Sequence, residues 1–195
     1  MKINISLDKK SIQNAIKQIN AVKKKIQKDL PTLYLNKCVA SIIDMANRNL
    51  LLTNIGSEVQ DKIQNGWQVS QVVKNQITLS NIAEFEKGKN LAVFVEFGVG
   101  IVGQGQSHKL ASQAGYEYNV LSDAKDQFGN WIYSLEGGVG TMNIESNYYE
   151  ISNDGLWIKT KGSPSTMFLY KAWKEFETSG LYKRLWEQAK AEVIG

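Results

Sequence analysis

Cysteine and histidine are nearly missing from this 195-residue chain, which holds one of each, Cys38 and His108. A lone cysteine cannot close an internal disulfide, and the two residues supply too few ligands for a zinc site. A Ser-His-Asp triad would have to use His108, which lies in a glycine-rich stretch without a nucleophile-elbow motif. The sequence therefore predicts no disulfide, no metal centre and no cofactor, and we expect a protein that is not an enzyme.

Long apolar runs are also lacking. No segment approaches the roughly 20 consecutive apolar residues that a membrane-spanning helix needs. The first residues, MKINISLDKK, are interrupted by lysines and contain no apolar core of the length found in a signal peptide. We therefore expect a soluble protein that is made in the cytoplasm and has no membrane partner.

Positive charge is concentrated at the start of the chain. Residues 1–31 carry eight lysines and two aspartates, a net charge of +6, whereas the whole chain carries +4, so the remainder carries −2. The sequence thus predicts a basic N-terminal element on a nearly neutral body.

Residues 8–54 have the apolar period of an amphipathic helical element. Pro31 falls inside this pattern, and since proline disrupts a helix interior we expect a kink or a helical hairpin there. The first apolar stripe comprises Ile12, Ala15, Ile16, Ile19, Val22, Ile26 and Leu30, and the opposite, basic face comprises Lys10, Lys17, Lys24 and Lys28.

The chain changes character after Gly66. Residues 66–161 are predicted to form a β-rich body, with strands at 67–73, 77–82, 131–133 and 156–158 and a hairpin turn at Lys74-Asn75-Gln76. Residues 91–97 fit either a third strand or a short helical turn. Two glycine-rich segments, 98–115 and 134–155, are predicted to be projecting loops.

Two helices are predicted at the C-terminus, over residues 164–194. Ser163 and Pro164 are typical of a helix start, and Ser179-Gly180 predicts the break between the two helices. Helices, then strands, then helices indicate an α+β fold, with a long N-terminal helix packed on a small, mainly antiparallel sheet. We expect one domain over residues 1–195.

Gly98, Gly100 and Gly103 form a G-x-G-x-x-G motif, which in dinucleotide-binding enzymes begins a helix that faces a pyrophosphate. That fingerprint also needs a following parallel strand. Here the next residues are polar and glycine-rich, and 116–120 lacks the β-branched run of a buried parallel strand. The sequence therefore disfavours a nucleotide site.

Glycine also allows positive φ angles and close approach of a second backbone, which favours a compact loop over 98–115. Glu96 directly precedes this loop. Its carboxylate either accepts hydrogen bonds that fix the loop or faces water, and the sequence leaves both interpretations open. We select Glu96, Gly98, Gly100, Gly103 and His108 as candidate assembly-loop residues. A carboxylate pair formed by Glu96 with Glu84 or Glu86 also stays open.

At these residues the chain resembles a family of long-tailed phage proteins, the small neck and tail-completion proteins often labelled minor capsid or minor tail components. The resemblance rests on the stretch FVEFGVGIVG at 94–103, on His108, and on GYEY at 115–118. Further matching residues are the sequence WIY at 131–133, Trp157, Thr160, Gly162, Pro164 and the sequence FLYKA at 168–172. This chain has Val99 and Lys109 where the family usually has threonine and often has proline.

The resemblance implies an α+β subunit without enzymatic activity, found in a virion, a prophage particle or a phage-tail-like particle. It implies ring assembly with copies of itself, in many cases as a hexamer, and contact with other neck, connector or tail-tube proteins. Assembly would take place in the host bacterial cytoplasm.

A second interpretation uses the basic helix face. Lys10, Lys17, Lys24 and Lys28 are suited to non-specific contact with the DNA backbone, either in a channel or as an independent nucleic-acid-binding module. They are equally suited to simple exposure to solvent, as on most amphipathic helices. No recognised nucleic-acid-binding motif accompanies them.

Overall fold

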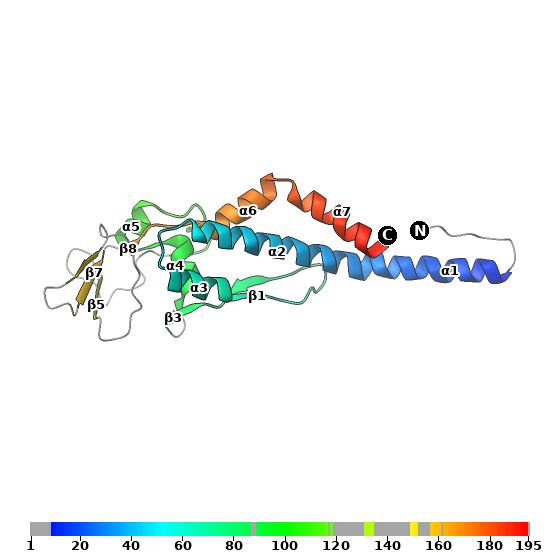
Figure 1. The fold of residues 1–195 in the computed structure, drawn as a ribbon, viewed down its shortest axis with the longest axis horizontal. Helices are drawn as coiled ribbons and strands as arrows, with labels where there is room; N and C mark the ends of the chain where they lie inside the picture. The colour runs from blue at the N-terminus through cyan, green and yellow to red at the C-terminus, as the bar shows by residue number, and fades with distance from the viewer. Residues whose placement is uncertain are drawn as a thin grey trace. The chain divides into compact units, whose positions relative to one another are not determined.

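The fold was analysed in a computed structural model, which describes residues 9–86, 89–116, 118, 131–134, 149–151, 157–160 and 162–194. Figure 1 shows the order of helices and strands. The chain forms two compact units. The first contains residues 1–42, 69–79 and 174–195, and the second contains residues 43–68 and 80–173. That both belong to a single domain stays a prediction.

The mixed α+β class with a long N-terminal helix and C-terminal helices is confirmed. The N-terminal helix begins as α1 (Lys9–Lys24), continues through a π-helical segment η1 (Lys25–Asp29) and ends as α2 (Leu30–Leu51). The chain does not reverse at Pro31, so the hairpin alternative is wrong.

The π-helical segment explains how the helix passes Pro31. Proline has no N–H, and its ring collides with the carbonyl group four residues earlier in a regular α-helix. Immediately before it, the Leu30 N–H bonds to the Lys25 carbonyl five residues back, so the backbone has widened by one residue per turn. The altered turn accommodates the proline without ending the helix.

In the first unit, helix α7 (Leu181–Ile194) lies against η1. The Trp186 ring meets the Tyr34 ring edge-on, with 5.2 Å between centroids, and Lys37 Nζ lies 2.8 Å from Glu192 Oε1. The predicted break before α7 is confirmed, because two residues, Ser179 and Gly180, separate it from α6 (Phe168–Thr178), and Gly180 has φ +66°.

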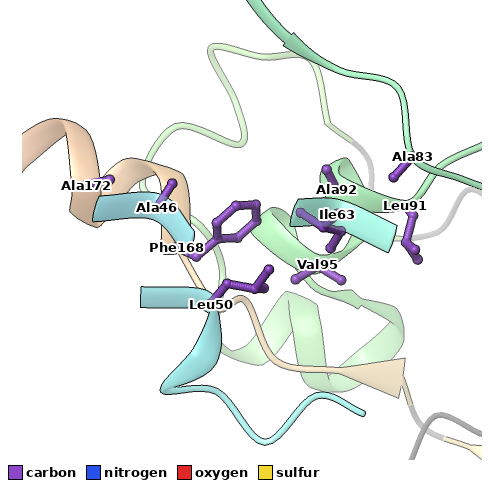
Figure 2. Packing of buried hydrophobic residues seen from close by; sticks show 9 residues of the cluster. All are labelled: Ala46, Leu50, Ile63, Ala83, Leu91, Ala92, Val95, Phe168 and Ala172. Atoms are coloured by element: carbon purple, nitrogen blue, oxygen red, sulfur yellow. The ribbon is translucent and has the colours of Figure 1, made fainter. Parts of the chain in front are cut away.

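The core of the second unit lies between helices rather than on a sheet (Figure 2). Side chains from α2, α3 (Ser57–Asn65), α4 (Leu91–Phe97) and α6 meet there. The core residues are Ala46, Leu50, Ile63, Ala83, Leu91, Ala92, Val95, Phe168 and Ala172.

Within the described residues the strands lie in three small sheets, whereas one small sheet was predicted. The first pairs β1 (Trp67–Val69) with β2 (Leu79–Asn81), and the second pairs β3 (Glu84–Glu86) with β4 (Lys89–Asn90). The third is antiparallel, in the order β5 (Trp131–Ser134), β7 (Trp157–Thr160), β6 (Tyr149–Ile151). Strand β6 lies inside the range 134–155 predicted to be a loop, and the rest of that range, apart from Ser134, lies outside the described residues.

The turn between β1 and β2 is confirmed. Val73 and Gln76 exchange two backbone hydrogen bonds of 3.0 Å around Lys74 and Asn75, whose φ angles are +51° and +60°. Positive φ at both central residues is the geometry that suits a two-residue hairpin loop.

The predicted body is less β-rich than expected, because α3, α4 and α5 (Gly100–Gly105) lie within or beside it. Residues 91–97 are helical, the second of the two alternatives. The Asn90 side chain accepts a hydrogen bond from the Val93 N–H, and Gly98 follows the last turn with φ +76°. These are ordinary N-terminal and C-terminal helix signals, and they outweigh the β-branched residues of this run.

Candidate functional site: a buried carboxylate at the start of α6

The Glu96 side chain is the centre of a group of polar contacts in the second unit. It leaves α4 near its C-terminal end and is only 7% exposed. Its Oε2 accepts a hydrogen bond of 2.8 Å from the Leu169 N–H, and its Oε1 accepts one of 2.9 Å from the Tyr170 N–H. Glu96 thus caps the N-terminus of α6 from a helix more than 70 residues earlier in the chain.

A carboxylate suits this position for two reasons. The first N–H groups of a helix have no partner within the helix, and the aligned peptide dipoles place partial positive charge there. The Lys171 N–H donates to the Met167 carbonyl, four residues earlier, as in a regular α-helix. The two preceding N–H groups, of Leu169 and Tyr170, donate to Glu96 instead. Glu96 therefore supplies the missing acceptors and a complementary charge.

His108 is the second partner of the Glu96 carboxylate. Its Nε2 lies 2.9 Å from Glu96 Oε1, and only 4% of the residue is exposed. Its Nδ1 accepts a hydrogen bond of 3.0 Å from the Leu110 N–H, so Nδ1 carries no proton. The neutral tautomer with the proton on Nε2 fits both contacts, because Nε2–H then donates to the carboxylate.

The segment before α6 is held to the end of α4 by its backbone and hydroxyl groups. Ser165 Oγ donates to the Glu96 carbonyl at 2.7 Å, and Thr166 Oγ1 donates to the Val95 carbonyl at 2.8 Å. The Thr166 and Met167 N–H groups bond to the same two carbonyls. These contacts keep residues 164–167 out of the helix, which corrects the predicted start at Ser163-Pro164.

The glycines of the G-x-G-x-x-G motif allow two backbones to touch. A Cβ on Gly98 would lie 2.5 Å from the Ser165 nitrogen and 2.7 Å from the Ser163 oxygen, and one on Gly103 would lie 2.8 Å from the Gly98 carbonyl carbon. Val99 also pairs with Ser163 of β8 (Gly162–Ser163) in an antiparallel bridge. The helix here, α5, is six residues long and begins at Gly100, not at the third glycine. The motif therefore serves close packing.

Aromatic rings surround the Glu96–His108 pair. Phe97 packs on the His108 ring with 4.5 Å between centroids and stacks on Tyr116 at 4.7 Å, while Tyr170 meets His108 edge-on at 5.3 Å. The Tyr116 hydroxyl donates to the Gly98 carbonyl at 2.6 Å, and burial raises the pKa of this hydroxyl well above its ordinary value. The Tyr118 hydroxyl accepts a hydrogen bond of 2.7 Å from the His108 N–H.

The structure brings together four of the five candidate assembly-loop residues. Glu96, Gly98, Gly103 and His108 are all buried, so Glu96 does not face water and His108 is not an exposed loop residue. Gly100 is the first residue of α5. These residues hold the 98–116 segment against α6, and their part in assembly stays a prediction. Among the described residues, the partners of the Glu96 carboxylate are His108, Leu169 and Tyr170, and the carboxylate pair stays a prediction.

The second set of candidate residues lies elsewhere, on the long helix. Lys10, Lys17 and Lys24 of α1 and Lys28 of η1 are exposed. On the same helical segment Ile12, Ile16, Ile19 and Ile26 are 41–52% exposed, although the sequence predicted a core-facing stripe, and only Ala15 of that stripe in α1 is buried.

The polar atoms of the Glu96–His108 pair make contacts within the chain. Both Glu96 oxygens and both His108 ring nitrogens already have partners inside the chain. Among the residues that the structure describes, no group of three or more candidate metal ligands occurs. Within the same residues, no helix has both the length and the apolar content for crossing a membrane.

The sequence does not reveal the part of this site that comes from α6 and from the segment before it. Glu96 and His108 were selected, but Leu169 and Tyr170 contribute backbone N–H groups, which have no sequence signature. The predicted helix start at Ser163-Pro164 places Ser165 and Thr166 in the first turn of the helix, where their hydroxyls would not be expected to bond to α4. A usable signal is Gly98, because a glycine directly after the mainly apolar residues 91–97 predicts a helix end beside Glu96.

Comparison with known proteins does not place the chain in a family. No family model, no curated protein and no solved structure matches it. The resemblance to phage neck and tail-completion proteins therefore rests on the residues quoted above.

Proposed function

We propose that the protein is a non-enzymatic structural subunit of a phage, prophage or phage-tail-like particle, acting in head–tail joining or tail completion as a ring-forming neck protein. One observation carries the proposal. Two of the segments that carry the resemblance, 94–116 and 162–172, pack on each other around Glu96 and form one structural element. The residues that this chain shares with the family support the proposal more strongly when they contact one another than when they are scattered through the fold.

The chemistry of this element favours a scaffold role. Its carboxylate and imidazole are used to join α4, the 98–116 segment and α6, and the glycines let the backbones approach. A subunit that must keep its shape while neighbours bind gains from such internal bonds, since a fully satisfied buried network rigidifies the structure. Partners would be copies of the chain, in many cases six in a ring, and other neck, connector or tail-tube proteins.

A deletion experiment tests the proposal. The gene is removed from the phage or prophage that encodes it, and induced lysates are inspected by negative-stain electron microscopy. We expect capsids and tails that remain unjoined, or tails with an unfinished end, and restoration of complete particles by the wild-type gene supplied in trans. Complete particles at wild-type numbers in the deletion strain would refute the proposal.

Nucleic-acid binding is the second candidate, favoured by the exposure of Lys10, Lys17, Lys24 and Lys28. If these four lysines neutralise four phosphates, the logarithm of the DNA affinity should fall with the logarithm of salt with a slope of about −3.6. The quadruple lysine-to-glutamine variant should abolish that slope. Salt-independent binding, or equal binding by the variant, would exclude this candidate.

A further inference from the structure

The apolar stripe of α1 follows a heptad repeat. Five of its members, the last of them in η1, alternate three and four residues apart, which is the 3.5-residue period of a coiled coil. Isoleucine stands at every first position of this register, and Ile16 falls at a flanking position. We call these residues the α1 seam: Ile12, Ala15, Ile19, Val22 and Ile26. In this register Lys10, Lys17 and Lys24 recur every seven residues on the outermost position, and Lys23 and Lys25 flank the seam on either side.

The isoleucines of the seam are more exposed than the apolar side chains further along the same long helix. In α2, Leu30, Val39 and Ile42 are buried, with exposures of 2–7%. Helix α7 lies against η1 and ends at Ile194 (Figure 1). By contrast, Ile12 and Ile19 of α1 and Ile26 of η1 are 41–50% exposed, although the small Ala15 between them is buried. A seam with this period is suited to packing against another helix, because side chains repeated every 3.5 residues fit as knobs into the holes of a second helix.

The charges beside the seam identify the kind of helix. Residues 9–29 contain seven lysines and one aspartate, a net charge of +6. Residues that flank a coiled-coil seam select the partner through interhelical ion pairs, so Lys23 and Lys25 select a helix with acidic flanks. Among the helices that the structure describes, none is strongly acidic, since the net charges are −1 for α3 and α4, 0 for α5 and α6, and +1 for α2 and α7.

We infer that α1 is one strand of a heterotypic coiled coil and takes an amphipathic helix with acidic flanks from a different protein. A second copy of α1 is a poor occupant because it would place two segments of charge +6 side by side. A membrane surface is also disfavoured, because interfacial helices carry Trp, Phe or Leu on the apolar face and α1 carries none of these. The inference uses α1 alone and does not depend on the proposed function.

The test uses the full chain and two synthetic probes. Both are three-heptad peptides with Ile and Leu in the seam; one carries Glu at all flanking positions and the other carries Lys. Fluorescence anisotropy should show saturable binding of the Glu probe and binding of the Lys probe at least about tenfold weaker, as charge pairing at these positions dictates. Ile19→Asp should weaken Glu-probe binding by at least about tenfold, because it buries an unpaired charge in the seam.

A matched pair of charge reversals separates the seam flanks from general electrostatics. The variant K23E/K25E should lose the Glu probe and gain the Lys probe, whereas K17E/K24E makes the same change in net charge on the outer face and should keep Glu-probe affinity within about threefold. Circular dichroism checks that each variant keeps its helix content.

Four outcomes would overturn the inference. These are absence of Glu-probe binding, equal losses in the two charge-reversal variants, concentration-dependent self-association that Ile19→Asp abolishes in sedimentation velocity, and binding of the chain to phosphatidylserine vesicles in preference to the Glu probe. The third would make a second copy the occupant of the seam, and the fourth would make it a lipid surface.

Discussion

Removing the Glu96 side chain is the most direct perturbation of the site. In Glu96→Ala, the Leu169 N–H, the Tyr170 N–H and the His108 Nε2–H lose their common acceptor in a region where Glu96 is 7% exposed. Each buried donor left without a partner costs roughly 1–3 kcal/mol. Partial access of water to the new space offsets some of this cost, so we expect a loss of about 4 kcal/mol in the free energy of unfolding.

The conservative variant Glu96→Gln separates charge from shape. The carboxamide has an NH₂ group in place of one carboxylate oxygen. This NH₂ group would face an N–H group, so two donors would meet where the wild type has a hydrogen bond. The variant also loses the negative charge at the helix N-terminus, a contribution of about 0.3–2 kcal/mol. We expect Glu96→Gln to cost about 2–3 kcal/mol, because it combines one mismatched hydrogen bond with the loss of that charge.

Urea denaturation followed by circular dichroism measures these changes. With a slope of about 2 kcal/mol per molar urea, a loss of 4 kcal/mol lowers the transition midpoint by about 2 M. The control is Glu58→Gln, which removes the ion pair between Lys62 and the 64% exposed Glu58. Because this pair is on the surface, the control should change stability by less than about 0.5 kcal/mol. A Glu96→Ala variant within 1 kcal/mol of the wild type would refute the capping argument.

Hydrogen exchange locates the same effect. The Leu169 and Tyr170 amide protons should be protected in the wild type and should exchange at least about tenfold faster in Glu96→Ala, since 1.4 kcal/mol corresponds to a factor of ten. Unchanged exchange at these two positions would mean that the carboxylate does not hold the start of α6.

Three further predictions follow from single contacts. Gly98→Ala should destabilise the protein by more than about 3 kcal/mol in the same urea assay, because its Cβ meets backbone atoms and its φ is +76°, whereas Gly105→Ala, which meets nothing within 4 Å, should stay within about 1 kcal/mol of the wild type. Nitrogen-15 NMR should find the proton of the His108 ring on Nε2, since Nδ1 accepts from the Leu110 N–H, and the opposite tautomer would contradict the geometry. Burial raises the pKa of Tyr34 from 10.0 to about 12, so its stabilising contribution should be complete below pH 10 and lost as the pH rises through about 12. The tyrosinate absorbance of wild type minus Tyr34→Phe measures this, and a midpoint near pH 10 would contradict it.

Several elements were predictable because their signals are local. The long helix, the Lys74-Asn75 turn and the break at Gly180 depend on periodicity and on residues whose backbone preferences act within a few positions. The passage of the helix through Pro31 was not predictable, since a π-helical turn and a kink have the same sequence signature.

The sequence by itself determined where the charge lies, the heptad period of α1, and that one histidine and one cysteine are too few for common catalytic sites. Only the tertiary structure decided that Glu96 and His108 are buried together and that α6 starts at Phe168 instead of Ser163. The reason is that Glu96 meets the α6 backbone across more than 70 residues of chain. Backbone N–H groups are present at every residue except proline, so folding alone determines which of them a carboxylate reaches.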